Sequence, residues 1–234
     1  MKRELNRLPS RLQGRGDRTI IKPMDQSMHF DGFVLTGGES SRMGKDKAQM
    51  TIGGMKLFER AATALSEICH QSVSVVGRCE TYDPLRTELD ITDLPDLRVR
   101  GRNLPRAPIT GLYTALTEAK TPWITVLACD LPFVTGDLMT KLRGFCSDEF
   151  DAVVPVQPDE RPQPLCAFYR RESCLPAVER MLFAGDLKLQ RLMSHLRTRF
   201  VNFEEISALP GSAHFFLNVN TIENYESAQK IITS

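Results

Sequence analysis

Hydrophobic and polar positions along this chain follow two alternating periods, that of a β-strand and that of an α-helix. From residue 30 onward, short β-branched or apolar runs are followed by segments whose apolar residues recur every three or four positions. The predicted strands are residues 30–36, 72–77, 123–129, 151–156, 164–169 and 199–203. The predicted helices are residues 56–70, 111–119, 135–145, 173–183, 187–195 and 221–232. Residues 90–108, rich in Pro, Arg and Asp, are predicted to form a loop.

This alternation predicts an α/β fold, in which helices cover both faces of a mostly parallel sheet. The strand at 164–169 is predicted to be the hairpin partner of 151–156. Ligands of such sheets bind beyond the carboxyl ends of the strands. Functional residues are therefore expected just after Thr36, just after Cys129 and just after Phe216 and Leu217. No internal repeat or linker is evident, so residues 30–234 are predicted to form a single domain.

Composition narrows the class of protein. Of 234 residues, 41% are hydrophobic and 25% charged, as is usual for soluble globular proteins. No apolar run approaches the roughly 18 residues of a membrane span, and a net charge of +1 gives no sign of a nucleic-acid partner. The six cysteines form no C-x-x-C pair, and several lie in apolar runs. Buried free thiols and a cytoplasmic location are therefore expected.

Residues 1–29 are predicted to be a basic extension outside that domain. The first 23 residues hold seven Lys or Arg and two Asp or Glu, without the apolar segment of a secretory signal. A disordered tail, or a start placed too early with Met24 or Met28 as the true beginning, is the favoured interpretation. A nucleic-acid-binding arm is the alternative.

The segment FVLTGGESSRMGKDKAQM, residues 33–50, carries two adjacent glycines and then three basic residues. Glycine lets the backbone approach a ligand, and consecutive N–H groups can form a nest that binds an anion. This is not a P-loop, because Gly38 and Gly44 are separated by five residues and an aspartate follows Lys45 where Ser or Thr is needed. It is not the dinucleotide fingerprint either, because its first two glycines are adjacent.

Another pattern does fit this segment, L-x-G-G-x-S-x-R-M-G-x-D-K-A. Its ten matched positions are Leu35, Gly37, Gly38, Ser40, Arg42, Met43, Gly44, Asp46, Lys47 and Ala48. The pattern resembles the signature of nucleotidyltransferases, specifically the molybdenum cofactor guanylyltransferases, the protein A type of the MobA-like NTP transferase family. The resemblance covers residues 30–232 and implies a three-layer, Rossmann-like nucleotidyltransferase fold.

The resemblance implies that this loop binds GTP. Arg42 and Lys47 would hold the triphosphate and offset charge at the α-phosphate, so both are candidate catalytic residues. Other residues of the motif would contact the nucleotide: Leu35, Thr36, Gly37 and Gly38. Guanylyl enzymes of this family read L-A-G-G and cytidylyl relatives read L-A-A-G. Gly37 therefore favours guanine, while Thr36 replaces the usual alanine.

An aspartate ends the apolar strand in VLACDLPFV, residues 126–134. A carboxylate at this place can bind Mg²⁺, which keeps several waters and needs few protein carboxylates. The segment resembles the C-D-x-P metal site of the family, with Cys129, Asp130 and Pro132 matched. Asp130 is therefore predicted to be a catalytic residue that binds the nucleotide and Mg²⁺. The alternative is an aspartate that only caps the chain after a strand.

Two further segments resemble parts of the nucleotide site. Asp93 matches an acidic residue that follows the third strand of the family and would contact the nucleoside. Gly111 matches the end of a G-P-L-x-G-like turn, and is predicted to start a helix whose N-terminus could hold an anion. Four arginines between them either reach phosphates or form a solvated loop face: Arg98, Arg100, Arg102 and Arg106.

Two segments resemble parts of the acceptor site. ERPQPL resembles the family's R-x-H-P-L, with Arg161 and Pro164 matched and Gln163 where histidine is common; a plain hairpin is the alternative. FFLNVNTIE resembles F-x-N-[VI]-N-T-x-E. In an extended chain Asn218 and Asn220 point the same way, so both amides could contact the cofactor substrate or complete the metal shell.

The resemblance thus implies Mg²⁺-dependent transfer of GMP from GTP to molybdenum-molybdopterin. Further partners it implies are other molybdenum cofactor biosynthesis proteins and molybdoenzyme chaperones. The four scattered histidines and the lack of a Ser/His/Asp set suit phosphoryl chemistry, which depends on positioning and charge. Two alternatives remain: a nucleotidyltransferase that uses CTP or a sugar phosphate, and a non-catalytic nucleotide-binding protein.

Overall fold

The central element of the molecule is a seven-stranded sheet. The computed structural model describes residues 29–36, 47–69, 73–77, 91–94 and 107–233, with 91–94 described by their backbone alone. The strands of this sheet are β1 (Phe30–Leu35), β4 (Val73–Val76), β5 (Ile91–Leu94), β6 (Trp123–Ala128), β7 (Ala152–Pro155), β8 (Cys166–Arg170) and β9 (Thr198–Val201). Their spatial order is β5-β4-β1-β6-β8-β7-β9. Among these described strands β8 alone is antiparallel to its neighbours, which confirms a mixed, mostly parallel sheet.

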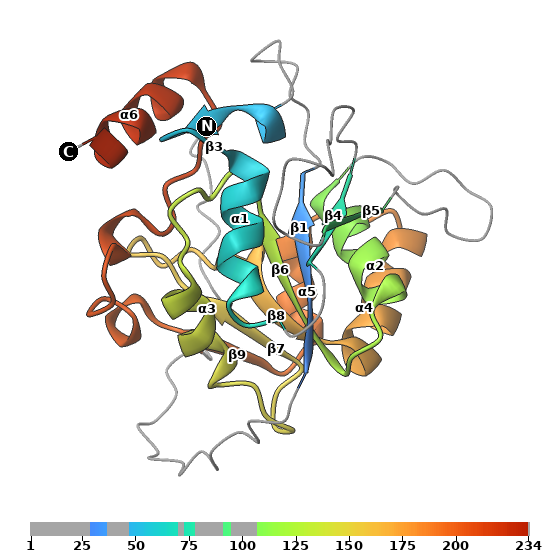
Figure 1. Cartoon of the computed structure of the whole chain (residues 1–234). Helices are drawn as coiled ribbons and strands as arrows, with labels where there is room; N and C mark the ends of the chain where they lie inside the picture. Colours follow the sequence, from blue (N-terminus) through green and yellow to red (C-terminus); the bar gives the residue numbers. More distant parts are fainter. Residues whose placement is uncertain (1–28, 37–46, 70–72, 78–90, 95–106, 234) are drawn as a thin grey trace, which may run out of the picture.

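Helices cover both faces of the sheet and make three layers (Figure 1). The helices are α1 (Leu57–Ser66), α2 (Pro108–Glu118), α3 (Gly136–Arg143), α4 (Arg171–Phe183), α5 (Leu189–Leu192) and α6 (Ile222–Thr233). Short 3₁₀ turns are η2 (Lys47–Gln49), η4 (Met193–His195), η5 (Phe203–Glu205) and η6 (Ser212–His214). One cluster of buried side chains joins α1 and α3 to the sheet, and the other joins α2, α4 and α5 to it.

The period-two pattern of the strands explains these two clusters. In β1, Phe30 and Val34 belong to the cluster under α1, whereas Phe33 and Leu35 belong to the opposite one. Every residue of β1 and of β6 is buried. These central strands are buried along their whole length because helices cover them on both sides, and apart from Asp31 and Thr125 their residues carry no polar side chain.

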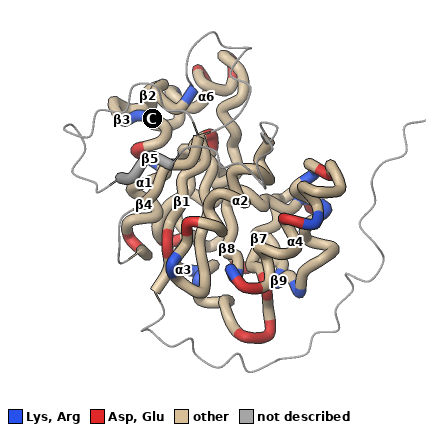
Figure 2. Tube along the Cα trace, turned by 90° about the vertical axis from the view of Figure 1, so that its right-hand side faces the viewer, with Lys and Arg blue, Asp and Glu red and all other residues tan. Residues whose placement is uncertain are grey.

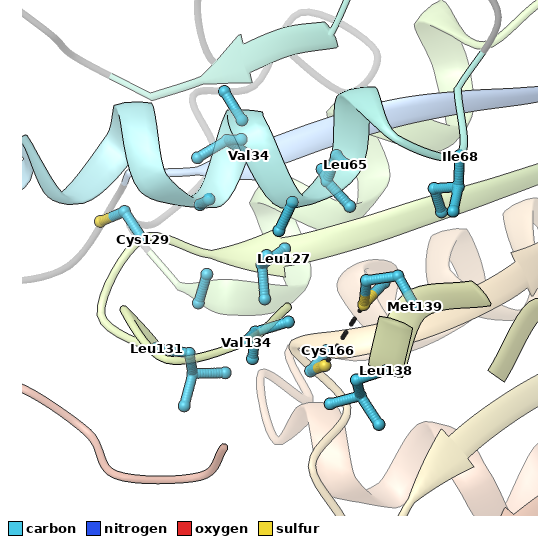
Figure 3. Close-up of a cluster of buried hydrophobic side chains, with 14 of the residues drawn as sticks. Val34, Leu65, Ile68, Leu127, Cys129, Leu131, Val134, Leu138, Met139 and Cys166 are labelled. Carbon is cyan, nitrogen blue, oxygen red and sulfur yellow. Dashed lines mark hydrogen bonds between the residues drawn. The ribbon is translucent and has the colours of Figure 1, made fainter. Parts of the chain in front are cut away.

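The core under α1 and α3 is closely packed (Figure 3). Leu65 of α1 and Met139 of α3 both belong to this buried cluster, and the Cys166 thiol donates to the Met139 sulfur at 3.7 Å. Gly32 of β1 lets the end of α1 approach, since an added Cβ would lie 2.7 Å from Cys69 Sγ. Such packing fixes the sheet edge that carries the candidate site.

The five described cysteines are buried thiols that belong to no disulfide, as the sequence predicted for them: Cys69, Cys129, Cys146, Cys166 and Cys174. Burial raises the pKa of Cys69 and of Cys166 to about 12. Both therefore stay protonated and poorly nucleophilic at neutral pH.

The predicted helices are confirmed apart from their ends. α2 begins at Pro108, three residues before the predicted start at Gly111, because proline has no N–H to lose in a first turn. Thr135 caps α3 as predicted, with its hydroxyl accepting from Leu138 N at 3.3 Å. Helix 187–195 becomes α5 followed by η4, and strand 199–203 becomes β9.

Two predictions at the sheet were wrong. The loop at 90–108 contains a strand, β5, which pairs with β4 at the edge of the sheet. Phe216 and Leu217 do not end a strand; they follow η6 in an irregular segment. The sequence also gave no sign of the hairpin β2 (Thr51–Ile52) and β3 (Met55–Lys56), whose strands have two residues each.

Charged residues lie mainly on the helices and connecting segments, while the middles of the central strands carry few of them (Figure 2). No helix within the described residues is long and apolar enough to cross a membrane.

Candidate active site

The carboxyl ends of the central strands meet at one edge of the sheet. Thr36, just after β1, donates its backbone N–H to Val76 O of β4 at 2.9 Å. Cys129, just after β6, donates to Leu35 O at 3.1 Å. Ala128 donates to Leu165 O, just before β8, at 2.8 Å. These bonds place the ends of β1, β4 and β6 side by side, as the topology rule for parallel sheets predicts.

Three polar side chains converge at this edge. Lys47 Nζ lies 3.1 Å from Asp130 Oδ2 and 2.7 Å from Asn220 Oδ1. The Lys47 and Asp130 side chains are 16% and 24% exposed, so the ion pair is only partly screened by water. The sequence predicted each of these residues for the site, and the structure brings all three together.

Asp130 is held rigidly from both sides. Its neighbours Cys129 and Leu131 are 4% and 1% exposed and anchor the turn after β6 in the core. Its carbonyl accepts from Val219 N at 2.9 Å. The capping alternative does not hold for the next helix, because the N-cap of α3 is Thr135, and the Asp130 carboxylate contacts Lys47.

The segment around Asn220 shows the predicted alternation of side chains. Val219 is fully buried, while Asn218 is partly exposed and Asn220 exposed. The Val219–Asp130 bond therefore explains how an irregular segment reaches the end of β6 without being a strand. Asn220, a candidate functional residue expected just after Phe216 and Leu217, lies at this edge, although no strand ends at those two residues.

The donor set suits a hard divalent cation. Asp130 Oδ2 and Asn220 Oδ1 lie within hydrogen-bond distance of one ammonium, so a carboxylate and an amide oxygen already face a positive charge. Mg²⁺ prefers such oxygen ligands and keeps several waters. The described residues contain no cluster of three His, Cys, Asp or Glu side chains, which argues against a site of the zinc type in that part of the chain.

Thr36 and Leu35 contribute their side chains to packing. The Thr36 hydroxyl is buried and donates to Val76 O at 3.1 Å, toward the sheet. Leu35 packs against α2, where its side-chain carbons would be 3.5 Å from a Cβ added to Gly111. Gly111 thus lies in the first turn of α2, against the end of β1, and does not start the helix.

The segment with the predicted acceptor residues connects β7 to β8, and its last residue, Leu165, bonds to β6, accepting from Ala128 N. Val156 forms an isolated bridge with Pro162, and Tyr169 Oη donates to the buried Pro164 carbonyl at 2.7 Å. Arg161 is exposed and forms an ion pair with Asp159, its nitrogen and the carboxylate oxygen 2.5 Å apart. The Arg161 guanidinium lowers the pKa of the Asp159 carboxyl by hydrogen bonding.

Four predicted site residues cannot be located in this geometry. Gly37, Gly38 and Arg42 lie outside the described residues, and Asp93 is described by its backbone alone, within β5. Two residues that the sequence analysis overlooked are Tyr225 and Gln229, which both donate to Thr51 O. Their spacing of four on the last helix, which puts two polar side chains on one face, was the available signal.

The sequence and the fold both match those of known nucleotidyltransferases. A family model of the MobA-like NTP transferase domain matches residues 32–200, a span that includes Lys47 and Asp130. The chain belongs to this family. It is therefore a nucleotidyltransferase with a Rossmann-like fold, which confirms the resemblance seen in the glycine-rich loop.

Individual relatives cover nearly the whole fold. A Geobacillus sp. (strain WCH70) protein named "Probable molybdenum cofactor guanylyltransferase" is 30% identical over 196 residues, 83% of this chain and 95% of that protein. A Desulfosudis oleivorans protein named "Molybdenum cofactor guanylyltransferase" is 30% identical over 202 residues, covering 86% and 95%. The crystal structure of molybdopterin-guanine dinucleotide biosynthesis protein A from Archaeoglobus fulgidus has a TM-score of 0.69 at 24% identity, covering 87% and 99%, and supports the fold.

Proposed function

We propose that this chain transfers GMP from GTP to the terminal phosphate of molybdenum-molybdopterin, giving molybdopterin guanine dinucleotide and pyrophosphate. The observation that carries the proposal is the convergence of Lys47, Asp130 and Asn220 at the carboxyl edge of the sheet. The names of the relatives that are 30% identical over most of the chain support the choice of substrates.

In this reaction an oxygen of the pterin phosphate attacks the α-phosphorus of GTP. The bond from that phosphorus to the oxygen bridging the β-phosphate breaks, and pyrophosphate leaves with the electron pair. No protein nucleophile is required, so the residues contribute by positioning and by neutralising charge. Lys47 and Arg42 would hold the triphosphate, while Leu35, Thr36, Gly37, Gly38, Asp93 and Gly111 would line the nucleotide site.

Asp130 and Asn220 would hold a Mg²⁺ ion. A bound Mg²⁺ neutralises phosphate charge and aligns phosphate oxygens. The same oxygens contact the Lys47 ammonium at 3.1 and 2.7 Å, so Lys47 would turn from them toward the triphosphate when the nucleotide binds. Asn218, Arg161 and Pro164 would contact the pterin. Their segments reach the end of β6 through two backbone bonds, from Ala128 N to Leu165 O and from Val219 N to Asp130 O.

The experiment gives the purified chain molybdenum-molybdopterin, Mg²⁺ and each of the four ribonucleoside triphosphates in turn, and measures pyrophosphate. Release with GTP alone is expected. Release with CTP would instead favour the cytidylyl alternative, and GTP binding without turnover would favour a non-catalytic role.

A variant of the candidate metal ligand tests the site. Asp130→Ala should lower turnover by at least about a hundredfold while the fold is retained, because charge stabilisation at the reacting phosphates is lost. Asp148→Ala is the matched control, since Asp148 is 95% exposed in its ion pair with Arg170 at the opposite end of the sheet. Full activity in Asp130→Ala would contradict the assignment.

A further inference from the structure

The last helix holds the short segment that carries Lys47. α6 lies beside the β2–β3 hairpin (Figure 1), which follows Lys47 by four residues in the sequence. Tyr225 Oη donates to Thr51 O at 2.7 Å, and Gln229 Nε2 donates to the same oxygen at 2.9 Å. Gln229 Nε2 also lies 2.8 Å from Tyr225 Oη. One backbone carbonyl of β2 is therefore fixed by two side chains from 174 and 178 residues away.

A second contact fixes the turn of the hairpin. Gly53 has a φ of +57°, and a Cβ added there would lie 2.6 Å from Ile232 Cγ2 in the last turn of α6. Only glycine combines this backbone conformation with so close an approach. The hairpin is thus held at β2 and at its turn.

Hydrogen bonds connect this anchored hairpin to Lys47. Met50 N donates to Lys47 O at 3.1 Å, and Leu57 N donates to Met50 O at 2.9 Å. The backbone from Lys47 to the start of α1 is thereby tied to the same hairpin that α6 holds. A shift of the hairpin would move the point from which the lysine side chain extends.

The other end of α6 holds the partner of Lys47. Asn220 lies two residues before the helix, and its N–H donates to Asn224 Oδ1 at 3.4 Å. Asn224 N donates in turn to Thr221 Oγ1 at 3.2 Å. α6 therefore contacts both Asn220 and the hairpin that follows Lys47. The two residues joined by the Lys47–Asn220 hydrogen bond are thus both positioned by the same helix.

We infer that Tyr225 and Gln229 are positioning residues, which place the Lys47 ammonium at Asp130 and Asn220 by holding the Thr51 carbonyl. The inference rests on the proposed function for its catalytic consequence, but the placement of Lys47 is a separate property of the chain. The two residues act through the backbone and touch no substrate.

The first test measures the placement of Lys47 without nucleotide. Reductive methylation followed by mass spectrometry gives the rate at which each lysine amine reacts. In Tyr225→Phe combined with Gln229→Leu, Lys47 should react about fivefold faster, since two hydrogen bonds that restrain its segment are lost. Lys120, at the opposite end of the sheet, should react at an unchanged rate. An unchanged rate at Lys47 would overturn the inference, whatever the enzyme's activity.

The second test connects the placement to the reaction. The same double variant should lower kcat with GTP by about tenfold, because a small misplacement of a catalytic group is costly. In a Lys47→Met background the two α6 substitutions should change the residual rate less than twofold, since they act through that lysine. Equal losses in both backgrounds would indicate general destabilisation and refute the inference. Glu226→Gln and Ser227→Ala, exposed on the same helix, are the matched controls.

If the wild-type chain releases no pyrophosphate with any nucleotide, the proposed function fails. The labelling result still decides the inference in that case, because it uses the chain alone. Rapid labelling of Lys47 already in the wild type would overturn the inference without touching the proposed function.

Discussion

Replacing Lys47 with methionine should tighten the binding of a divalent cation in the absence of nucleotide. The Lys47 ammonium lies 3.1 Å from Asp130 Oδ2 and 2.7 Å from Asn220 Oδ1, the two oxygens proposed to hold the cation. These two oxygens cannot bind the Lys47 ammonium and a divalent ion at the same time. In the wild-type chain the cation must therefore displace the lysine, whereas in Lys47→Met it need not.

The size of the effect follows from the geometry of the pair. Two unit charges 3.1 Å apart attract by roughly 5 kcal/mol at an effective dielectric constant of about 20. Desolvation and the ordering of two side chains that are 16% and 24% exposed reduce this to a net of ~1–2 kcal/mol, between that of an exposed ion pair and that of a buried hydrogen bond to a charged group. Removing the Lys47 ammonium should therefore make the divalent cation bind roughly fivefold to thirtyfold more tightly.

The assay is a titration of the nucleotide-free chain with Mn²⁺, followed by electron paramagnetic resonance or calorimetry. Lys120→Met serves as the control, because it removes the same charge just before β6, at the far end of the sheet. Adding Asp130→Ala to Lys47→Met should abolish the gain. Mn²⁺ affinity in Lys47→Met that is no higher than in the control would refute the reasoning.

Two further predictions concern residues outside that pair. Thr36→Ala should leave the preference for GTP over CTP unchanged, because the Thr36 hydroxyl donates to Val76 O of the neighbouring strand. The free energy of unfolding should fall by only ~1 kcal/mol, since Val76 O keeps its bond from Thr36 N. Parallel nucleotide assays and urea melts check both results, and a switch toward CTP would contradict the first. The hydrogen bonds of Arg197 lower the pKa of the Asp151 carboxyl from 3.8 to about 2. The ionised carboxylate therefore stabilises the folded state fully above pH 4, and this stabilisation is lost as the pH falls toward 2. Asp151→Asn should therefore be less stable than wild type near pH 7, and the difference in unfolding free energy should shrink between pH 4 and pH 2; a constant difference across that range would count against the ion pair.

Much of the fold could be predicted because its signals are local. A strand such as β6, buried on both faces, needs an unbroken apolar run, and Thr135 before an amphipathic segment marks a helix start. β5 was missed because it has only four residues, one of them Asp93, and a segment rich in proline and arginine follows it. Its strand character comes from pairing with β4, a tertiary interaction that propensity does not report.

The direction of a side chain was harder to predict than its place. Thr36 stands in the nucleotide motif where alanine is usual, and its hydroxyl donates to the neighbouring strand. Gly111 was expected to open a helix, but it lies in the first turn, packed on Leu35. In both cases packing against a strand, which a motif does not report, decides what the residue touches.

The residues of the candidate site could be grouped from the sequence because the topology of a parallel sheet brings together segments that are far apart along the chain. Lys47 is 83 residues from Asp130 and 173 from Asn220, so local pattern does not relate them. Parallel pairing of β1 with β6 makes their carboxyl ends coincide, which places the segments after both strands at one edge. Asn220 arrives by another route, through the Val219–Asp130 backbone bond. An amide oxygen of the last segment and a carboxylate after β6 therefore face the same lysine, and the proposed cation site depends on the docking of the C-terminal segment as much as on the sheet.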